Sequence, residues 1–426
     1  MSQGQRTDTG MTRKDFLKTA TLGTAALALG PRVAWAQQKP IKIGGQFSMT
    51  GGLASFGVWG SRAAEAAVKK INAEGGINGR PLEYVAEDAE TNVPTGIRKM
   101  RKLILQDEVD FVVGDVHSGV NIACAPLAKE LNTIYFGYGT AVETTAQKGN
   151  RYIFRGMTNM RIHMKALVYG AMDQIGKRWY MMAADYAWGH SVVEETKRFV
   201  LEKGGTVVGE KFAPLGTPDF IPYLSGLNPA DIDVIVIGFF VRDARTLITQ
   251  IQELFGGKVR VTGNVGVIEG MLPKDLGPGG EGVWFVDQYP RLSEYVREPL
   301  KPFDKVFRER VGINAEGLGM KDRDVSTISF CYTPWEHVHY IKHAMVQSGW
   351  KSKKDNPAFI KALEGMELKA SLDFPQGDKL VRAQDHQVFH DQYICRIEEG
   401  KLVVKTHVPK EQLFYPPEVD YTKETV

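Results

Sequence analysis

Residues 233–238 read Asp-Val-Ile-Val-Ile-Gly and indicate the fold class of this chain. Four consecutive β-branched residues predict a strand that is buried on both faces, which is typical of a parallel sheet covered by helices on each side. Residues 110–114 read Asp-Phe-Val-Val-Gly and repeat the pattern of an aspartate, an apolar strand and a glycine that opens a loop. We therefore predict one such strand in each of two similar α/β lobes.

Strand and helix patterns alternate along most of the chain. The predicted strands are residues 41–45, 82–86, 111–113, 133–136, 179–182, 207–212, 234–238 and 283–286. The predicted helices are a segment around 64–71 and residues 93–106, 121–130, 160–175, 191–203 and 243–254. Residues 300–365 are predicted to be helical, and short β-like runs follow at 387–396 and 401–405. This repeated order predicts an α/β protein with parallel sheets.

Length and composition predict a protein with a large core. The chain has 426 residues, of which 43% are apolar and 24% charged, which is enough for two domains. The first 36 residues hold five of the 53 basic and two of the 50 acidic residues. The remaining residues therefore hold 48 of each kind and are formally neutral. A neutral chain lacks the positive excess that nucleic acid or anionic lipid requires. Three widely spaced cysteines exclude a zinc-finger framework.

The N-terminus has the features of a signal peptide. Arg13 and Lys14 precede an apolar run at residues 19–30, which is too short to span a bilayer. Residues 34–36, Ala-Trp-Ala, supply the small-x-small pattern of a cleavage site, so we predict a signal peptide over residues 1–36 that is cleaved after Ala36. The basic pair resembles a twin-arginine signal in which lysine replaces the second arginine, which leaves the export route open.

No motif predicts a catalytic centre, a cofactor or a metal. Residues 277–282 match G-x-G-x-x-G, but a predicted strand follows the glycines instead of preceding them, so a turn is the better interpretation. Two groups of side chains contain histidines at close spacing but lack the remaining ligands of a metal site. These groups are His337, His339 and His343, and Asp385, His386, His390 and Asp391. We predict a protein that is not an enzyme.

The loops that follow the predicted strands carry hydroxyl and aromatic side chains. Residues 115–119 follow one strand, residues 138–140 (Tyr-Gly-Thr) the next, and residues 185–189 and 239–240 follow two strands of the second lobe. Small molecules bind at this edge of an open α/β sheet. Aromatic walls with a few hydroxyl and backbone donors are typical of a binding pocket.

Several segments resemble the periplasmic solute-binding proteins of branched-chain amino-acid ABC transporters, the leucine/isoleucine/valine-binding protein family. The resemblance covers essentially the whole chain after the signal peptide, and its most specific piece is Asn-Ala-Glu-Gly-Gly-Ile-Asn-Gly-Arg-Pro-Leu at 72–82. The other matching segments are 47–51, 56–60, 113–118, 125–128 and 186–189.

The resemblance implies a type I periplasmic-binding fold of the Venus-flytrap kind, in which two doubly wound parallel-sheet lobes close on a ligand. Three hinge crossovers are expected near residues 156–159, 287–290 and 366–374. The expected first lobe comprises residues 40–157 and 290–366, and the second comprises 158–289 and 367–405. A C-terminal tail, residues 406–426, follows.

The resemblance also implies the residues that bind the ligand. Ser118, Tyr138 and Thr140 are expected to hold a carboxylate or carbonyl, and Phe56, Trp188 and Phe240 match pocket walls. The complete set of expected ligand-binding residues is Phe56, Ser118, Gly119, Tyr138, Gly139, Thr140, Tyr186, Trp188, Phe240 and Val265.

Two departures from the family pattern concern the ligand and the cysteines. Val265 stands where the amino-acid binders have an acidic residue that pairs with the ligand's ammonium group, and Asp185 and Glu269 are the alternatives for that role. Since a buried ammonium without a counter-charge costs several kcal/mol, we expect an uncharged or carboxylate ligand with an apolar or aromatic body. The family's disulfide is absent because Glu90 and His117 occupy its positions. A Cys331–Cys395 bond stays open.

The expected function is that of an exported, monomeric substrate-binding component of an ABC importer. It would capture a small carboxylate, amide or amino-acid-like solute in the periplasm and deliver it to a permease at the inner membrane. One alternative is a ligand sensor of the same fold that controls a signalling partner. Another alternative is an exported dehydrogenase that uses the glycines of residues 277–282.

Overall fold

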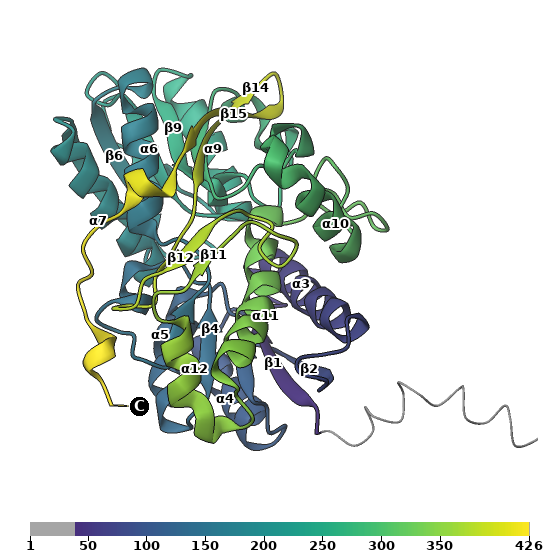
Figure 1. The fold of residues 1–426 in the computed structure, drawn as a ribbon. Helices are drawn as coiled ribbons and strands as arrows, with labels where there is room; N and C mark the ends of the chain where they lie inside the picture. Colours follow the sequence, from purple (N-terminus) through teal and green to yellow (C-terminus); the bar gives the residue numbers. More distant parts are fainter. Residues whose placement is uncertain (1–38, 426) are drawn as a thin grey trace, which may run out of the picture.

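The computed structural model describes residues 39–425 (Figure 1). The predicted signal peptide and its cleavage site lie outside the described residues. Within 39–425, no helix combines the length and the apolar character that a membrane span requires.

The first sheet is entirely parallel and has the strand order β2-β1-β3-β4-β5. Its strands are β1 (Ile41–Phe47), β2 (Leu82–Asp88), β3 (Phe111–Val113), β4 (Ile134–Gly137) and β5 (Ile153–Arg155). Helices α3 and α11 pack together on this lobe, and α4 and α5 form a second packed pair. These helices, with the shorter α12, are α3 (Ala54–Ala73), α4 (Val93–Leu105), α5 (Ser118–Glu130), α11 (Ile328–Ser348) and α12 (Asn356–Leu363).

The second sheet has the order β15-β14-β10-β9-β8-β6-β7 and is mixed. Five strands are parallel: β6 (Arg178–Ala184), β7 (Thr206–Ala213), β8 (Val234–Gly238), β9 (Arg260–Asn264) and β10 (Trp284–Asp287). Two antiparallel strands complete it: β14 (Gln392–Glu398) and β15 (Lys401–Val408). Its helices are α6 (Met160–Ile175), α7 (Ala187–Glu202), the short α8 (Ile221–Leu224) and α9 (Val241–Phe255). All five residues of β8 are buried, as its apolar sequence predicts.

The chain passes between the sheets at three places. It leaves β5 for α6 across residues 156–159, and it leaves β10 for α10 (Lys301–Val311) after residue 287. The third crossover, expected at 366–374, lies later, because residues 367–389 first form a separate antiparallel sheet. This small sheet comprises β11 (Glu367–Leu368), β12 (Lys379–Val381) and β13 (Val388–Phe389). Of the expected second-lobe segment 367–405, only residues from β14 onward join the second sheet.

Buried polar side chains connect all three passages. The Thr158 hydroxyl, in the first passage, donates to Gln288 Oε1 in the second at 3.3 Å. The Gln392 amide, at the start of β14, donates to Thr158 Oγ1 at 3.1 Å. All three residues are buried, so water does not compete for these hydrogen bonds. The hydrogen bonds therefore help to fix the geometry of the hinge.

Strands β5 and β9 lack a clear signal in the sequence. Strand β5 has only three residues, and β9, Arg-Val-Thr-Gly-Asn, contains polar residues and a glycine that weaken the strand pattern. Residues 277–280 fall in a 3₁₀ segment, Pro273–Gly280, and residues 281–282 form a turn that leads toward β10, as expected. The three cysteines are free and buried, so Cys331 and Cys395 form no disulfide in this structure.

Candidate ligand-binding cleft

The loops at the carboxyl ends of strands in both sheets face each other across a small cavity. The residues that line it come from both lobes: Leu53, Phe56, Val116, Thr140, Tyr186, Trp188, Phe240, Asn264, Gly266 and Phe330. The free space measures about 30 Å³, far below the about 150 Å³ of a cavity that holds benzene. A solute of that size therefore requires the two lobes to separate or the lining rings to move apart.

Aromatic rings form the walls of the cavity. Phe56 packs edge-on against Phe330 within the first lobe, with ring centroids 5.0 Å apart, and against Phe240 of the second lobe at 6.3 Å. Trp188 lies 5.5 Å from Phe240, and Tyr186 lies 6.0 Å from Trp188. The pair between Phe56 and Phe240 joins the two lobes directly, so it breaks when the lobes separate.

Helix N-termini hold these rings at the cleft. Phe56 and Phe330 lie in the first turns of α3 and α11, and Trp188 lies in the first turn of α7. Phe240 is the residue before α9, and the next residue, Val241, has a φ of 47°. A β-branched residue rarely adopts this left-handed conformation, which costs about 1–3 kcal/mol and marks a strained position at the cleft.

Thr140 and Asn264 supply polar groups to the cavity wall from opposite lobes. The Asn264 Oδ1 atom accepts a hydrogen bond from the Gly266 N–H at 3.2 Å, and its Nδ2 group donates to no protein atom within residues 39–425. The Thr140 hydroxyl makes no hydrogen bond to another described residue either. Both side chains are therefore available to a ligand.

His117 caps helix α5 beside the cleft. Its Nδ1 atom accepts from the Val120 N–H at 3.2 Å, so the proton of the neutral ring lies on Nε2. Burial lowers the pKa of His117, which keeps the ring neutral at pH 7. The ring lies 5.2 Å from that of Tyr186 and so forms another aromatic contact between the lobes.

Ser118 and Gly139 hold the site together instead of lining it. The Ser118 Oγ atom accepts a hydrogen bond from the Ala141 N–H at 3.1 Å and so fixes the loop that carries Thr140. The Gly139 N–H donates to Asn121 Oδ1 at 2.7 Å, and a Cβ at Gly139 would lie 2.7 Å from the Ser118 Cα. Only glycine permits this close approach between loop and helix.

Five of the ten expected ligand-binding residues line the cavity: Phe56, Thr140, Tyr186, Trp188 and Phe240. The structure corrects the expectation that Tyr138 lines the ligand site. The buried ring of Tyr138 packs against Phe47 and His337 in the first lobe, and it does not line the cavity. Ser118, Gly119, Gly139 and Val265 adjoin the cavity without lining it. The residues that the sequence analysis did not identify are Leu53, Val116, Asn264, Gly266 and Phe330.

Asp185 and Glu269, the two carboxylates considered as partners for a ligand ammonium group, pair with other residues of the protein. Asp185 is exposed and lies 2.9 Å from His190. Glu269 is buried and pairs with Arg291 at 3.0 Å. It also accepts from the N–H and the hydroxyl of Ser329, at 3.1 and 3.0 Å. Neither residue lines the cavity.

Asp115 is a third carboxylate near the cleft, and it is fully buried. The Ser48 hydroxyl donates to it at 2.6 Å. Burial raises the pKa of Asp115 to about 6, although the hydrogen bond from Ser48 opposes this shift. Among the described residues, the cavity lining contains no carboxylate, and no group of acidic, histidine or cysteine side chains is placed to hold a metal ion.

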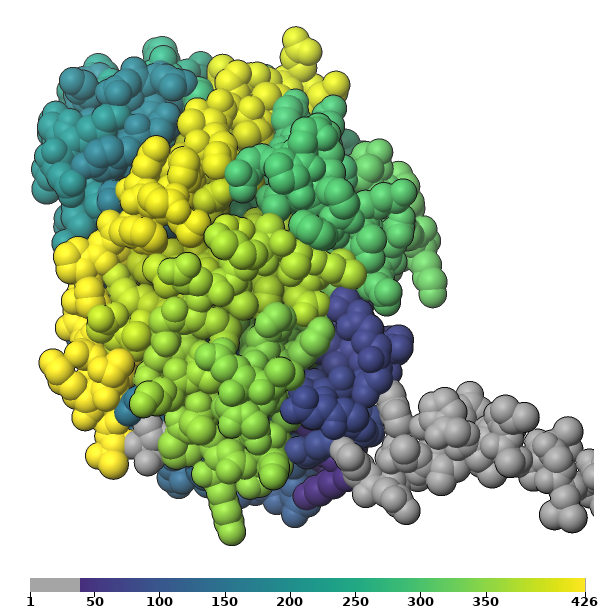
Figure 2. Space-filling view, viewed as in Figure 1, coloured from purple at the N-terminus to yellow at the C-terminus, as the bar shows by residue number. Residues whose placement is uncertain are grey.

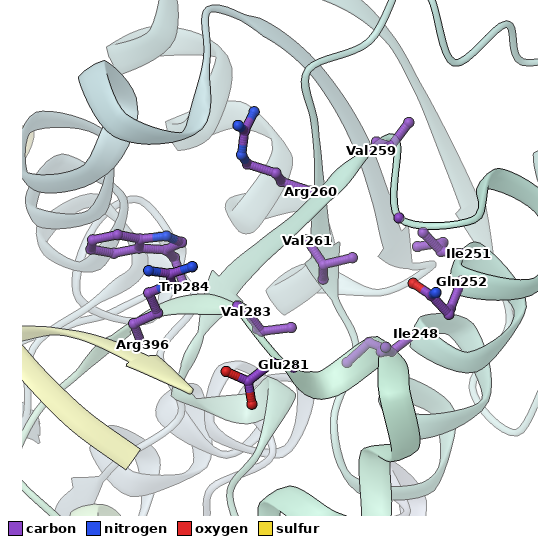
Figure 3. Close-up of a pocket in the computed structure, with 13 residues that line it drawn as sticks. Ile248, Ile251, Gln252, Val259, Arg260, Val261, Glu281, Val283, Trp284 and Arg396 are labelled. Carbon is purple, nitrogen blue, oxygen red and sulfur yellow. The ribbon is translucent and has the colours of Figure 1, made fainter. Parts of the chain in front are cut away.

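A second cavity, of about 210 Å³, lies at the opposite edge of the second sheet, beside the starts of β9 and β10 (Figure 3). In Figure 3, Ile248, Val261 and Val283 point toward a common space, and Arg396 lies against the Trp284 ring. Arg396 is already paired with an acidic side chain of its own strand, Glu398. This cavity lies within one lobe, so lobe closure does not act on it.

Comparisons with known proteins support the α/β fold. A family model for periplasmic binding proteins matches residues 40–401. Leu/Ile/Val-binding protein homolog 2 of Brucella abortus is 27% identical over 245 residues, which covers 57% of this chain and 65% of that relative. Homolog 4 of the same species is 28% identical over 244 residues, covering 55% and 58%. The match thus spans less than two thirds of each of these curated relatives.

Solved structures share the fold at low sequence identity. A solute-binding protein of an ABC transporter from Rhodopseudomonas palustris BisB5, in complex with 3,4-dihydroxybenzoic acid, has a TM-score of 0.73 and 21% identity, over 88% of this chain and 98% of that chain. An R. palustris solute-binding protein with benzoate has a TM-score of 0.74 and 19% identity, over 90% and 100%. A branched-chain amino-acid transporter substrate-binding protein from Streptococcus pneumoniae, in complex with isoleucine, has a TM-score of 0.70 and 20% identity. The match covers 87% of this chain and 99% of that chain. The predicted α/β fold is confirmed.

Proposed function

Because the chain belongs to the periplasmic binding protein family, we propose that it is the substrate-binding component of an ABC importer. Its ligand is a small carboxylate with an aromatic or apolar body, held between the two lobes. The observation that carries this proposal is the cavity lining: aromatic rings from both lobes, two free polar side chains, and no carboxylate among the described lining residues.

Closure of the lobes supplies the binding free energy. Phe56 on one lobe and Phe240 on the other meet across the cleft, so a flat apolar ligand between them contacts both lobes only in the closed form. Each edge-to-face or offset ring pair is worth about 0.5–1.5 kcal/mol beyond its buried area. A ligand that gains contacts only on closure shifts the population toward the closed form.

The polar end of the ligand lies toward the first lobe. The Thr140 hydroxyl lines the cavity there, and the N–H groups of Ser118 and Gly119 at the start of α5 have no backbone acceptor within residues 39–425. A helix N-terminus with free N–H groups favours a carboxylate. Asn264 of the second lobe donates to a further oxygen at the other end.

An α-amino acid fits this cleft less well. The Brucella relatives are named as Leu/Ile/Val-binding homologues, but an ammonium group needs a counter-charge, and both Asp185 and Glu269 are committed to other partners. Burying an unpaired ammonium costs several kcal/mol. We therefore favour aromatic acids of the kind named for the R. palustris structures.

The protein is proposed to act in the periplasm, as a monomer, and to deliver its solute to a permease at the inner membrane. The test of the ligand class is a thermal-shift screen of the purified protein, followed by calorimetry. Benzoate and hydroxybenzoates are expected to raise the melting temperature, and leucine, isoleucine, valine and urea are not. A large shift with the branched-chain amino acids and none with the aromatic acids overturns the proposed ligand class.

A further inference from the structure

The C-terminal segment, residues 409–425, runs from the second lobe to the first. It begins after β15, the edge strand of the second sheet, and its last residues lie beside the first lobe (Figure 1). In Figure 2 the yellow C-terminal residues, which include β14 and β15, lie on the surface of both the upper and the lower halves. It lies beyond residue 401, where the match to the family model ends. We call residues 409–425 the strap.

Tyr415 anchors the strap near the hinge. The Asn159 side chain, in the first passage between the lobes, donates to the Tyr415 hydroxyl oxygen at 2.6 Å. The guanidinium groups of Arg161 and Arg382 lie 4.9 and 4.5 Å from the centre of the Tyr415 ring. Arg161 belongs to α6, which packs on the second sheet. Cation–π contacts at such partly buried sites stabilise the position of the ring.

Tyr421 anchors the other end of the strap in the first lobe. Its side chain is buried, and its hydroxyl donates to the Ala146 carbonyl oxygen. Its ring packs edge-on against His386 at 5.5 Å. Three residues further on, Glu424 pairs with Lys129 of helix α5 at 2.5 Å. This end of the strap is therefore fixed to the first lobe by both packing and charge.

Glu418, between the two anchors, contacts both lobes through a single carboxylate. One oxygen lies 2.6 Å from a guanidinium nitrogen of Arg161, on the second lobe. The other accepts from the Gln147 side chain, in the loop after β4 of the first lobe, at 2.6 Å. Burial acts to raise the pKa of Glu418, but the hydrogen bonds from Arg161 and Gln147 outweigh it and hold the pKa below its ordinary value. The carboxylate is thus ionised at neutral pH.

Arg161 itself is held in place. Its guanidinium makes three hydrogen bonds of 2.8–3.0 Å to the buried Glu195 of α7, so it does not follow Glu418 when the lobes rotate. Separation of the lobes therefore breaks at least one of the two contacts of Glu418.

We propose that the strap is a fourth connection between the lobes and that Glu418 and Tyr421 are positioning residues, which favour the closed form without touching the ligand. This inference rests on the proposed function, because it concerns closure of the same cleft. A contact present only in the closed form lowers the population of the open form and slows ligand release by the same factor. One charge-assisted hydrogen bond at a partly exposed site corresponds to about a three- to tenfold effect.

The test compares Glu418→Gln, alone and combined with Tyr421→Phe, with the wild type and with the control Glu411→Gln. Glu411 is also a carboxylate of the strap, but within residues 39–425 its one ion pair is with its neighbour Lys410. Spin labels at cysteines introduced at Leu105 and Leu201, which are exposed on helices of the two lobes, report the distance between the lobes. The native cysteines are buried and do not compete for the label.

Without any ligand, the Glu418 variants are expected to add a population with a longer distance, and the Glu411 control is expected to match the wild type. With benzoate as the probe, the Glu418 variants are expected to release it three- to tenfold faster, and association is expected not to slow, because the ligand enters the open form. Identical distance distributions for all proteins overturn the strap proposal. If benzoate fails to bind even the wild type, the proposed ligand class is wrong, and the ligand-free distances still decide the role of the strap.

Discussion

Replacing Phe240 with alanine removes the ring through which the second lobe contacts the first at the cleft. The side chain is only 8% exposed and packs against Phe56 across the cleft and against Trp188 within its own lobe. Burying a phenylalanine side chain is worth about 1.5–3 kcal/mol, and an aromatic pair adds about 0.5–1.5 kcal/mol. The contact with Trp188 persists when the lobes separate, whereas the contacts with Phe56 and with a ligand form only on closure.

Roughly half of the free energy contributed by the Phe240 ring therefore comes from contacts that form on closure. We expect Phe240→Ala to weaken ligand binding by about 1–2.3 kcal/mol, which corresponds to about 5- to 50-fold. Isothermal titration calorimetry with benzoate, or with the acid that gives the largest thermal shift, measures this loss. The control is Leu254→Ala, since Leu254 is 42% exposed on helix α9 and is not among the residues that line the cavity. Unchanged affinity in the Phe240 variant would refute the assignment of this cavity as the binding site.

Three further changes test other parts of the structure. Thr140→Val is expected to weaken binding of a carboxylate ligand by about 1–3 kcal/mol, because one desolvated hydrogen bond is lost, and calorimetry measures the change. The control variant Thr246→Val, on the exposed face of α9, should bind the ligand normally. Val241→Asn is expected to raise the melting temperature by a few degrees, because asparagine tolerates the left-handed conformation at φ 47° and valine does not; a lower melting temperature would show that the valine side chain matters more than the backbone strain. Burial, and to a smaller extent the nearby Glu269 carboxylate, raise the pKa of Asp287 to about 8. The folded protein therefore keeps a proton on Asp287 that the unfolded chain releases above about pH 4. The free energy of unfolding should fall as the pH rises from about 4 to 8. Asp287→Asn should flatten that dependence in urea titrations at several pH values, and an unchanged slope would contradict the assignment.

Buried polar contacts explain why the Glu269 carboxylate does not line the cavity. Glu269 belongs to the loop that also carries Gly266 of the cavity wall, yet its carboxylate turns to Arg291 and to the start of α11. There it holds the first turn of the helix that presents Phe330 to the cavity. A residue that looks like an ammonium partner in the sequence thus acts as a support for an aromatic wall.

Local patterns in the sequence, together with the family resemblance, predicted the two-lobed α/β fold. The apolar runs at 111–113 and 234–238 form central strands, because a segment without polar side chains is stable only where helices cover both faces. The rule that loops at the carboxyl edge of a sheet bind small molecules, together with the family resemblance, identified Phe56, Thr140, Trp188 and Phe240 as residues of the cleft.

Tertiary contacts decided the rest. Phe330 and Asn264 reach the cavity from a distant helix and from a weakly patterned strand, and Tyr138 turns into the core although Thr140, two residues later, faces the cleft. The strap is a polar, proline-containing tail in the sequence, and only the folded chain brings Glu418 between Arg161 and Gln147. Periodicity and composition report which faces are buried locally, whereas pairings between residues far apart in the chain depend on how the lobes pack, and a single sequence carries no direct signal for that packing.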